Sequence, residues 1–134
     1  KTSGDSAVYT SAKAGTETLP GLIVFRYDSE LFYANANRFV DDVQEVFSTA
    51  PDPVRWLVID CSSVTDIDYS AAISLGGLID YVHAHKAHFG IMGADPGLLK
   101  TMDNLGLTKE FTEDRIFHNF DQVVDAYRKQ GAKS

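Results

Sequence analysis

The segment from Val54 to His83 constrains the fold more than any other part of this chain. It opens with Trp56 to Ile59, an unbroken apolar run rich in β-branched residues, which is typical of a central strand buried on both faces. Asp60 ends this run, and a polar turn follows it. Further apolar residues then recur at the spacing of one helix face, at positions 71, 72, 75, 78, 79 and 82. The segment therefore predicts a strand, a loop and a helix in that order.

Small polar residues gather where the predicted helix begins. They lie in the loop between strand and helix and are Thr65, Asp66, Asp68 and Ser70. In a parallel α/β sheet, the loops that leave the carboxyl ends of the strands open on one edge, where ligands bind. We therefore expect a functional site, if the chain has one, at this loop.

The rest of the chain repeats the alternation of strand and helix. Apolar runs predict strands at residues 22–27, 56–59, 87–92 and 115–117. Further helix starts are marked by Asn35 as a cap, by Asp95 with a proline after it, and by the capping box of Asn119 and Gln122. Gly106 marks the end of a helix, because glycine readily takes the left-handed conformation that ends helices.

These alternations predict a single α/β domain. We expect a mostly parallel or mixed sheet of about four to five strands, with right-handed crossovers and about four helices. The loops that follow the strands should then lie together at one edge of the sheet, at residues 28–35, 61–69, 93–96 and 118–119. That edge is the predicted functional face.

The length and composition predict how the chain is divided. A chain of 134 residues, 44% of them hydrophobic, can form one hydrophobic core. We expect a linker at residues 1–18, with room for one short edge strand, then a folded domain at 19–130 and a tail at 131–134. Because the first residue is Lys1 and not methionine, we also expect the chain to be a piece of a longer protein.

Charge and composition argue against several functions. The net charge of −7, with 19 acidic and 12 basic residues, argues against a nucleic-acid partner. No apolar run approaches the roughly 18 residues of a membrane span. The single cysteine, Cys61, excludes an internal disulfide. His83, His85 and His88 fall at a helix end with spacings that place them on different faces, so we predict no metal site.

The sequence VIDCSSVTDIDYSAAISL resembles the signature of STAS domains, in which a strand ends in Asp and a second Asp follows eight residues later. Asp60 and Asp68 have this spacing. In the anti-sigma factor antagonists of this family, a kinase phosphorylates the second hydroxyl residue after the second Asp, which corresponds to Ser70 here. The chain departs from the pattern at Tyr69, where Ser or Thr is usual, and at Ala71, where Gly is usual.

A second stretch, GLIVFRYDSELFYANANRF at residues 21–39, resembles the beginning of the cytoplasmic STAS domain of SulP-type anion transporters. Antagonists lack this stretch, and the whole resemblance covers residues 20–128. It implies the STAS fold and a regulatory or interaction role at the cytoplasmic face of the plasma membrane, in a carrier of sulfate or another anion. The implied partners are the transmembrane part of the same transporter and a regulatory protein or kinase. The alternative is a free-standing anti-sigma factor antagonist that acts as a phospho-switch.

The resemblance makes Ser70 the candidate phospho-acceptor, with Asp60, Asp66, Asp68 and Tyr69 around it at the loop edge. The position of Ser70 leaves a second interpretation open, in which it only helps to cap the helix and Asp68 or Tyr69 is the cap residue. Asp66 and Asp68 alternate along an extended segment and so point to opposite sides. They predict no catalytic pair, and we expect no enzyme activity and a monomer in isolation.

A nucleotide is a further expectation, since some STAS domains are reported to bind nucleotides. No cofactor is required, but GTP or ATP is a candidate weak ligand. Its phosphate would contact backbone N–H groups at two helix starts, near Ser70, Gly93 and Asp95. The carboxylates on this edge repel a phosphate and keep the expected affinity low.

Overall fold

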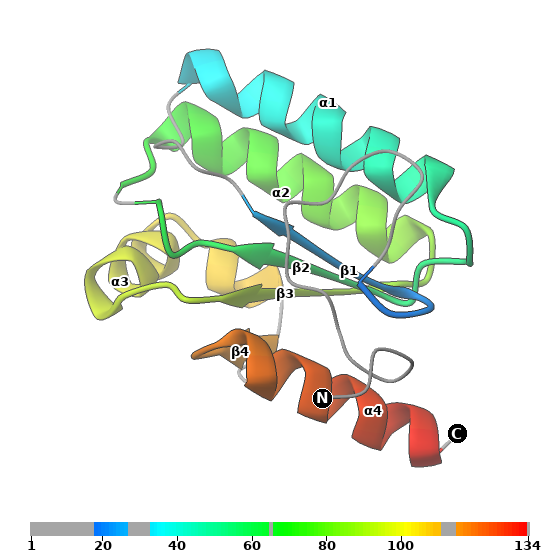
Figure 1. The fold of residues 1–134 in the computed structure, drawn as a ribbon. Helices are drawn as coiled ribbons and strands as arrows, with labels where there is room; N and C mark the ends of the chain where they lie inside the picture. The colour runs from blue at the N-terminus through cyan, green and yellow to red at the C-terminus, as the bar shows by residue number, and fades with distance from the viewer. Residues whose placement is uncertain (1–17, 27–32, 65, 111–114, 134) are drawn as a thin grey trace.

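The computed structural model describes residues 18–26, 33–64, 66–110 and 115–133 (Figure 1). Four parallel strands form one sheet in the order of the chain: β1 (Leu22–Arg26), β2 (Trp56–Asp60), β3 (His88–Met92) and β4 (Ile116–Phe117). The helices are α1 (Tyr33–Thr49), α2 (Tyr69–Ala84), α3 (Pro96–Asn104) and α4 (Phe120–Lys133), with a short 3₁₀ helix, η1 (Leu107–Glu110). The predicted fold class, a single α/β domain with a parallel sheet and four helices, is confirmed.

The order of the strands explains how the helices are distributed. Each strand lies next to the one before it in the chain, so every crossover moves in the same direction across the sheet. Right-handed crossovers in one direction place the connecting helices on one face. Accordingly, α1, α2 and α3 cover one face, and α4, which follows the last strand, covers the other (Figure 1).

The central strand β2 is buried on both faces, as its apolar run predicted. Leu57 and Ile59 pack toward α1, α2 and α3, whereas Trp56 and Val58 pack toward α4. This alternation is the two-residue period of a strand. By the same period, the side chain of Asp60 lies on the face of the sheet that α4 covers. The register partners of Asp60 are Arg26 of β1 and Met92 of β3.

Local signals in the sequence explain most of the element boundaries. The Oδ1 atom of Asp95 accepts a hydrogen bond from the N–H of Leu98 at 2.8 Å and caps α3. Gly106 follows α3 with a φ of +83°, the left-handed conformation expected of a terminating residue. Gly90 lies inside β3, where a Cβ atom would be 2.8 Å from the carbonyl oxygen of Arg115. This position therefore requires a residue without a side chain.

Two predicted boundaries differ from the structure. Helix α1 begins at Tyr33, so Asn35 lies inside the helix and is not its cap; the preference of Asn for cap positions does not by itself fix the residue at which a helix begins. Helix α4 continues to Lys133, into the segment predicted to be a tail. The predicted linker lies outside the described residues except for Thr18, and an isolated antiparallel bridge between Leu19 and Leu22 follows it. None of the described helices combines the length and the hydropathy that a membrane crossing requires.

Candidate functional site

Asp60, predicted at the loop edge, is fully buried beneath it. Its Oδ1 atom accepts two hydrogen bonds from Ser62, from the backbone N–H at 2.9 Å and from the hydroxyl at 2.7 Å. These bonds fold the chain back directly after β2, in the manner of an Asx turn. The Oδ2 atom is also buried and has no hydrogen-bond partner. Asp60 therefore orders the turn and does not face solvent at the loop edge.

Gly93 completes the packing over this turn. Its φ is +75°, and a Cβ atom there would lie 3.1 Å from the Cβ atom of Ser62 and 3.3 Å from Oδ1 of Asp60. Its N–H donates a hydrogen bond to the carbonyl of Phe117 at 3.1 Å. The N–H of Gly93, a predicted phosphate contact, is thus already bonded to β4.

Asp68 is the cap of α2. It has an extended backbone conformation, and its Oδ1 atom accepts a hydrogen bond from the N–H of Ala71 at 2.8 Å. Asp66 instead accepts a bond from the N–H of Ile67, also at 2.8 Å. Each of these two exposed carboxylates thus binds a backbone N–H close to it in the chain. Of the two cap residues considered from the sequence, Asp68 and Tyr69, the structure selects Asp68.

Ser70 lies in the first turn of α2, half-buried, and the described residues offer its hydroxyl no hydrogen-bond partner. Beside it are the two large apolar side chains that are exposed in the described part of the chain, Tyr69 at 68% and Ile73 at 59%. Residues three and four apart are neighbours on a helix surface. Tyr69, Ser70 and Ile73 therefore form one surface, named here the α2 patch.

Ile73 was not among the predicted site residues. The sequence pattern could have revealed Ile73, because this aliphatic residue falls outside the buried stripe of α2. An apolar side chain that the core does not use is informative when it lies beside another one. The α2 patch thus combines two exposed apolar groups with a hydroxyl that has no hydrogen-bond partner among the described residues.

Cys61, His85 and His88 have different surroundings in the structure. Burial, and then the negative charge of Asp60, raises the pKa of Cys61 to about 12, so this thiol is a poor nucleophile. A ring nitrogen of His85 lies 2.9 Å from the carbonyl oxygen of Tyr81. His88 instead packs edge-to-face on Trp56, with ring centroids 6.5 Å apart. The two histidines are directed to different neighbours.

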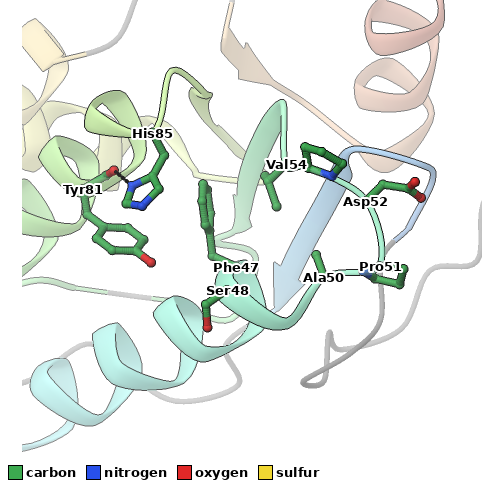
Figure 2. A pocket seen from close by; sticks show the side chains of 9 residues that line it. Phe47, Ser48, Ala50, Pro51, Asp52, Val54, Tyr81 and His85 are labelled. Atoms are coloured by element: carbon green, nitrogen blue, oxygen red, sulfur yellow. Dashed lines mark hydrogen bonds between the residues drawn. The ribbon is translucent and has the colours of Figure 1, made fainter.

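An open cleft of about 580 Å³ lies where α1 and α2 end (Figure 2). The α2 patch lies at the start of α2, at the opposite edge of the sheet. The ends of α1 and α2 and the loop between α1 and β2 form its walls. Its lining is mostly aromatic, aliphatic and proline side chains, from residues 47, 48, 50–54, 81 and 85. We name it the amino-edge cleft, because the strands begin at this edge. It was not predicted, since its walls come from segments far apart in the sequence.

The described side chains at the loop edge stabilise turns and helix starts, and one hydroxyl stays unbonded beside exposed apolar groups. The fold is a single α/β domain with a four-stranded parallel sheet. The family model described as the STAS domain matches residues 13–126. The chain therefore belongs to the STAS domain family, as the signature around Asp60 and Asp68 indicated.

Similar proteins agree with this assignment. A probable sulfate transporter of Mycobacterium tuberculosis is 29% identical over 112 residues, which are 84% of this chain and 20% of that protein. The chain thus spans about a fifth of the length of this relative.

Solved structures share the fold. The STAS domain of a SulP transporter from Vibrio cholerae superposes with a TM-score of 0.72 and 20% identity, over 87% of this chain and 89% of that one. A variant of RsbS from Moorella thermoacetica superposes with a TM-score of 0.66 and 16% identity, over 81% of this chain and 89% of that one.

Proposed function

We propose that this chain is the regulatory and interaction domain of a sulfate-type anion transporter, at the cytoplasmic face of the plasma membrane. The observation that carries the proposal is the sequence similarity to a probable sulfate transporter over 84% of the chain. Because the chain corresponds to only 20% of that relative, transport itself belongs to the remainder of the protein. The domain acts by binding to the transmembrane part or to a regulatory protein.

The α2 patch is the surface proposed for regulation. Its hydroxyl, Ser70, has no hydrogen-bond partner among the described residues and is half-buried in the first turn of α2. A phosphate there adds about −1.5 to −2 charges at pH 7, which a helix N-terminus tolerates. The added charge would stand beside the exposed side chains of Tyr69 and Ile73. Phosphorylation by a kinase would therefore change partner binding and leave the fold intact.

Transport measurements on the full-length protein test this role. We expect Ser70→Glu and Ser70→Ala to give different uptake of labelled sulfate, with both variants as stable as the parent to within about 0.5 kcal/mol. Lys129→Gln is the matched control, because it makes the same change in net charge at an exposed position on α4. Equal transport by both Ser70 variants, or an equal effect of Lys129→Gln, would contradict the phospho-switch.

A free-standing anti-sigma factor antagonist is the second candidate function. The fold shared with RsbS from Moorella thermoacetica favours it, at a TM-score of 0.66. The full open reading frame distinguishes the two candidates, because membrane-spanning segments in the same frame exclude a free-standing antagonist.

A weak GTP or ATP site at the loop edge is a further proposal. The N-termini of α2 and α3 are both there, but carboxylates of Asp68 and Asp95 already occupy N–H groups of their first turns. A phosphate must compete with these caps and with their charge, so weak and salt-sensitive binding is expected. In an NMR titration with GTP, amide shifts should centre on Ser70 and the loop at residues 93–95. Tight binding, or shifts confined to the amino-edge cleft, would contradict this site.

A further inference from the structure

The amino-edge cleft has the properties of a binding site. Its volume of about 580 Å³ falls within the range of ligand pockets, roughly 300–1,000 Å³. Figure 2 shows the Phe47 ring between the Tyr81 and His85 rings on one side and Val54 and Ala50 on the other. Phe47 meets Tyr81 and His85 edge-to-face, with ring centroids 5.3 Å apart in each case. One wall is therefore a fixed aromatic cluster, and the other is aliphatic.

The cleft lies at the edge where the chain enters the sheet. The N–H groups of Arg55 and Trp56, directly after the cleft loop, donate hydrogen bonds to the carbonyl of Gly21 at 2.8 and 3.0 Å. Gly21 directly precedes β1. Gly21 therefore lies beside the cleft loop, whereas α2 begins at the other end of the strands (Figure 1).

The charges around the cleft indicate the chemistry of its occupant. Asp52 lines the cleft and is exposed. Asp41 and Glu45 lie on the exposed surface of α1 at a four-residue spacing, and Ser48 continues this row to the cleft. Among the described residues, no ion pair is found for these three carboxylates. His85 is the one basic side chain in the lining, whereas the exposed Arg55 and Lys86 follow Val54 and His85 in the chain and do not line the cleft. The surface thus favours a partner with both apolar and basic side chains.

We infer that the amino-edge cleft docks a basic, amphipathic segment of the membrane-embedded part of the same protein. An apolar side chain of that segment inserts between Phe47 and Val54, and its Lys or Arg residues face Asp52 and Glu45. The inference rests on the proposed function, because cytoplasmic loops of membrane proteins carry an excess of Lys and Arg. It assigns the contact with the transmembrane part to the edge opposite Ser70, so that the α2 patch stays accessible to a kinase.

A peptide titration tests the chemistry of the cleft. The probe is a synthetic amphipathic peptide of leucine, phenylalanine and lysine, and the control probe has every lysine replaced by glutamate. We expect the basic peptide alone to shift the amide signals of Ala50, Asp52 and Val54 in NMR spectra of the ¹⁵N-labelled chain. Glu45→Gln combined with Asp52→Asn should weaken binding by about threefold to tenfold, as expected for two exposed charge pairs.

The matched control is Asp121→Asn combined with Asp125→Asn, which removes the same charge from exposed positions on α4 and should change the affinity by less than about twofold. Equal binding of the acidic peptide, or shifts centred on the α2 patch, would overturn the inference. Shifts that depend on protein concentration without peptide would assign the cleft to a second copy of the chain, and shifts with anionic lipid vesicles alone would assign it to the bilayer.

Cross-linking in the full-length protein tests the origin of the segment. Ser48→Cys places a thiol at the cleft, and Asp66→Cys places one at the opposite edge as a control; Cys61 is buried and stays unreactive. With a maleimide–succinimide linker, residue 48 should join to lysines of cytoplasmic loops, and residue 66 should not. The reverse pattern overturns the inference. Because sulfate uptake by the Ser70 variants is independent of this result, failure of the cleft and failure of the proposed function are distinguishable.

Discussion

Replacing Asp68 by alanine tests the assignment of this residue as the cap of α2. The substitution removes the 2.8 Å hydrogen bond that Oδ1 accepts from the N–H of Ala71, and it also removes a negative charge from a helix N-terminus. Loss of a cap side chain costs about 1 kcal/mol, and loss of the charge costs about 0.3–1 kcal/mol more. We therefore expect Asp68→Ala to lower the free energy of unfolding by about 1–2 kcal/mol, which lowers the Tm by about 3–6 °C in a domain of this size.

The unfolding of this domain can be followed through Trp56. It is the single tryptophan of the chain and is only 2% exposed, so its fluorescence changes when the core opens. Urea unfolding should show a lower midpoint for Asp68→Ala at an unchanged slope. Asp68→Asn keeps an acceptor at the same place and should lose only the contribution of the charge, about 0.3–1 kcal/mol.

Asp80→Asn and Ser70→Ala are the controls for Asp68→Ala. Asp80→Asn removes the same charge from an exposed position later in α2 and should leave the midpoint within about 0.5 kcal/mol of the parent. Ser70→Ala should behave likewise, because the described residues give its hydroxyl no hydrogen-bond partner. A loss of stability in Ser70→Ala as large as that in Asp68→Ala would show that Ser70 shares the capping role, and the cap assignment would be wrong.

Two other predictions concern glycine and cysteine. Gly77→Ala should raise the free energy of unfolding by about 0.5–1 kcal/mol, since nothing lies within 4 Å of the added Cβ atom. Gly90→Ala should lower the free energy of unfolding, because its Cβ atom would lie 2.8 Å from a backbone oxygen. Urea unfolding measures both changes. Burial raises the pKa of Cys61 from 9.0 to about 12, so folding favours the neutral thiol, and stability should fall as the pH rises from about 9 toward 12. In Cys61→Ala, the urea midpoint should no longer fall over this pH range for this reason. A midpoint that falls with pH as steeply in Cys61→Ala as in the parent would contradict the raised pKa of Cys61.

The elements that could be predicted from the sequence are those fixed by neighbouring residues. The apolar run of β2 and the stripe of α2 depend on periodicity within one segment, and both were found at the expected positions. The cap of α3 at Asp95 and the Asn119–Gln122 capping box are also local; Gln122 donates its N–H to Asn119, and its side chain accepts from His118. The start of α1 was missed because Asn35 resembles a cap when its tertiary contacts are unknown.

The parts of the site that could not be predicted depend on contacts between distant segments. Asp60 was expected at an exposed edge, but Gly93 from the next loop lies against its carboxylate and the Ser62 turn. The amino-edge cleft requires Val54, from the loop before β2, and Tyr81, from the end of α2, to lie around one space. A sequence pattern reports the period of one element. It carries no information on which loops meet at an edge.

The position of α4 has a consequence for the order in which the domain is completed. Trp56, Val58 and Phe117 face the side of the sheet that α4 covers with Val123 and Tyr127. Chains emerge from the ribosome with their N-terminal part first, so this face stays open to solvent until α4 has been synthesised. A nascent chain that ends before α4 therefore exposes a tryptophan-containing apolar surface to chaperones, and a premature stop there would yield a product prone to aggregation and degradation.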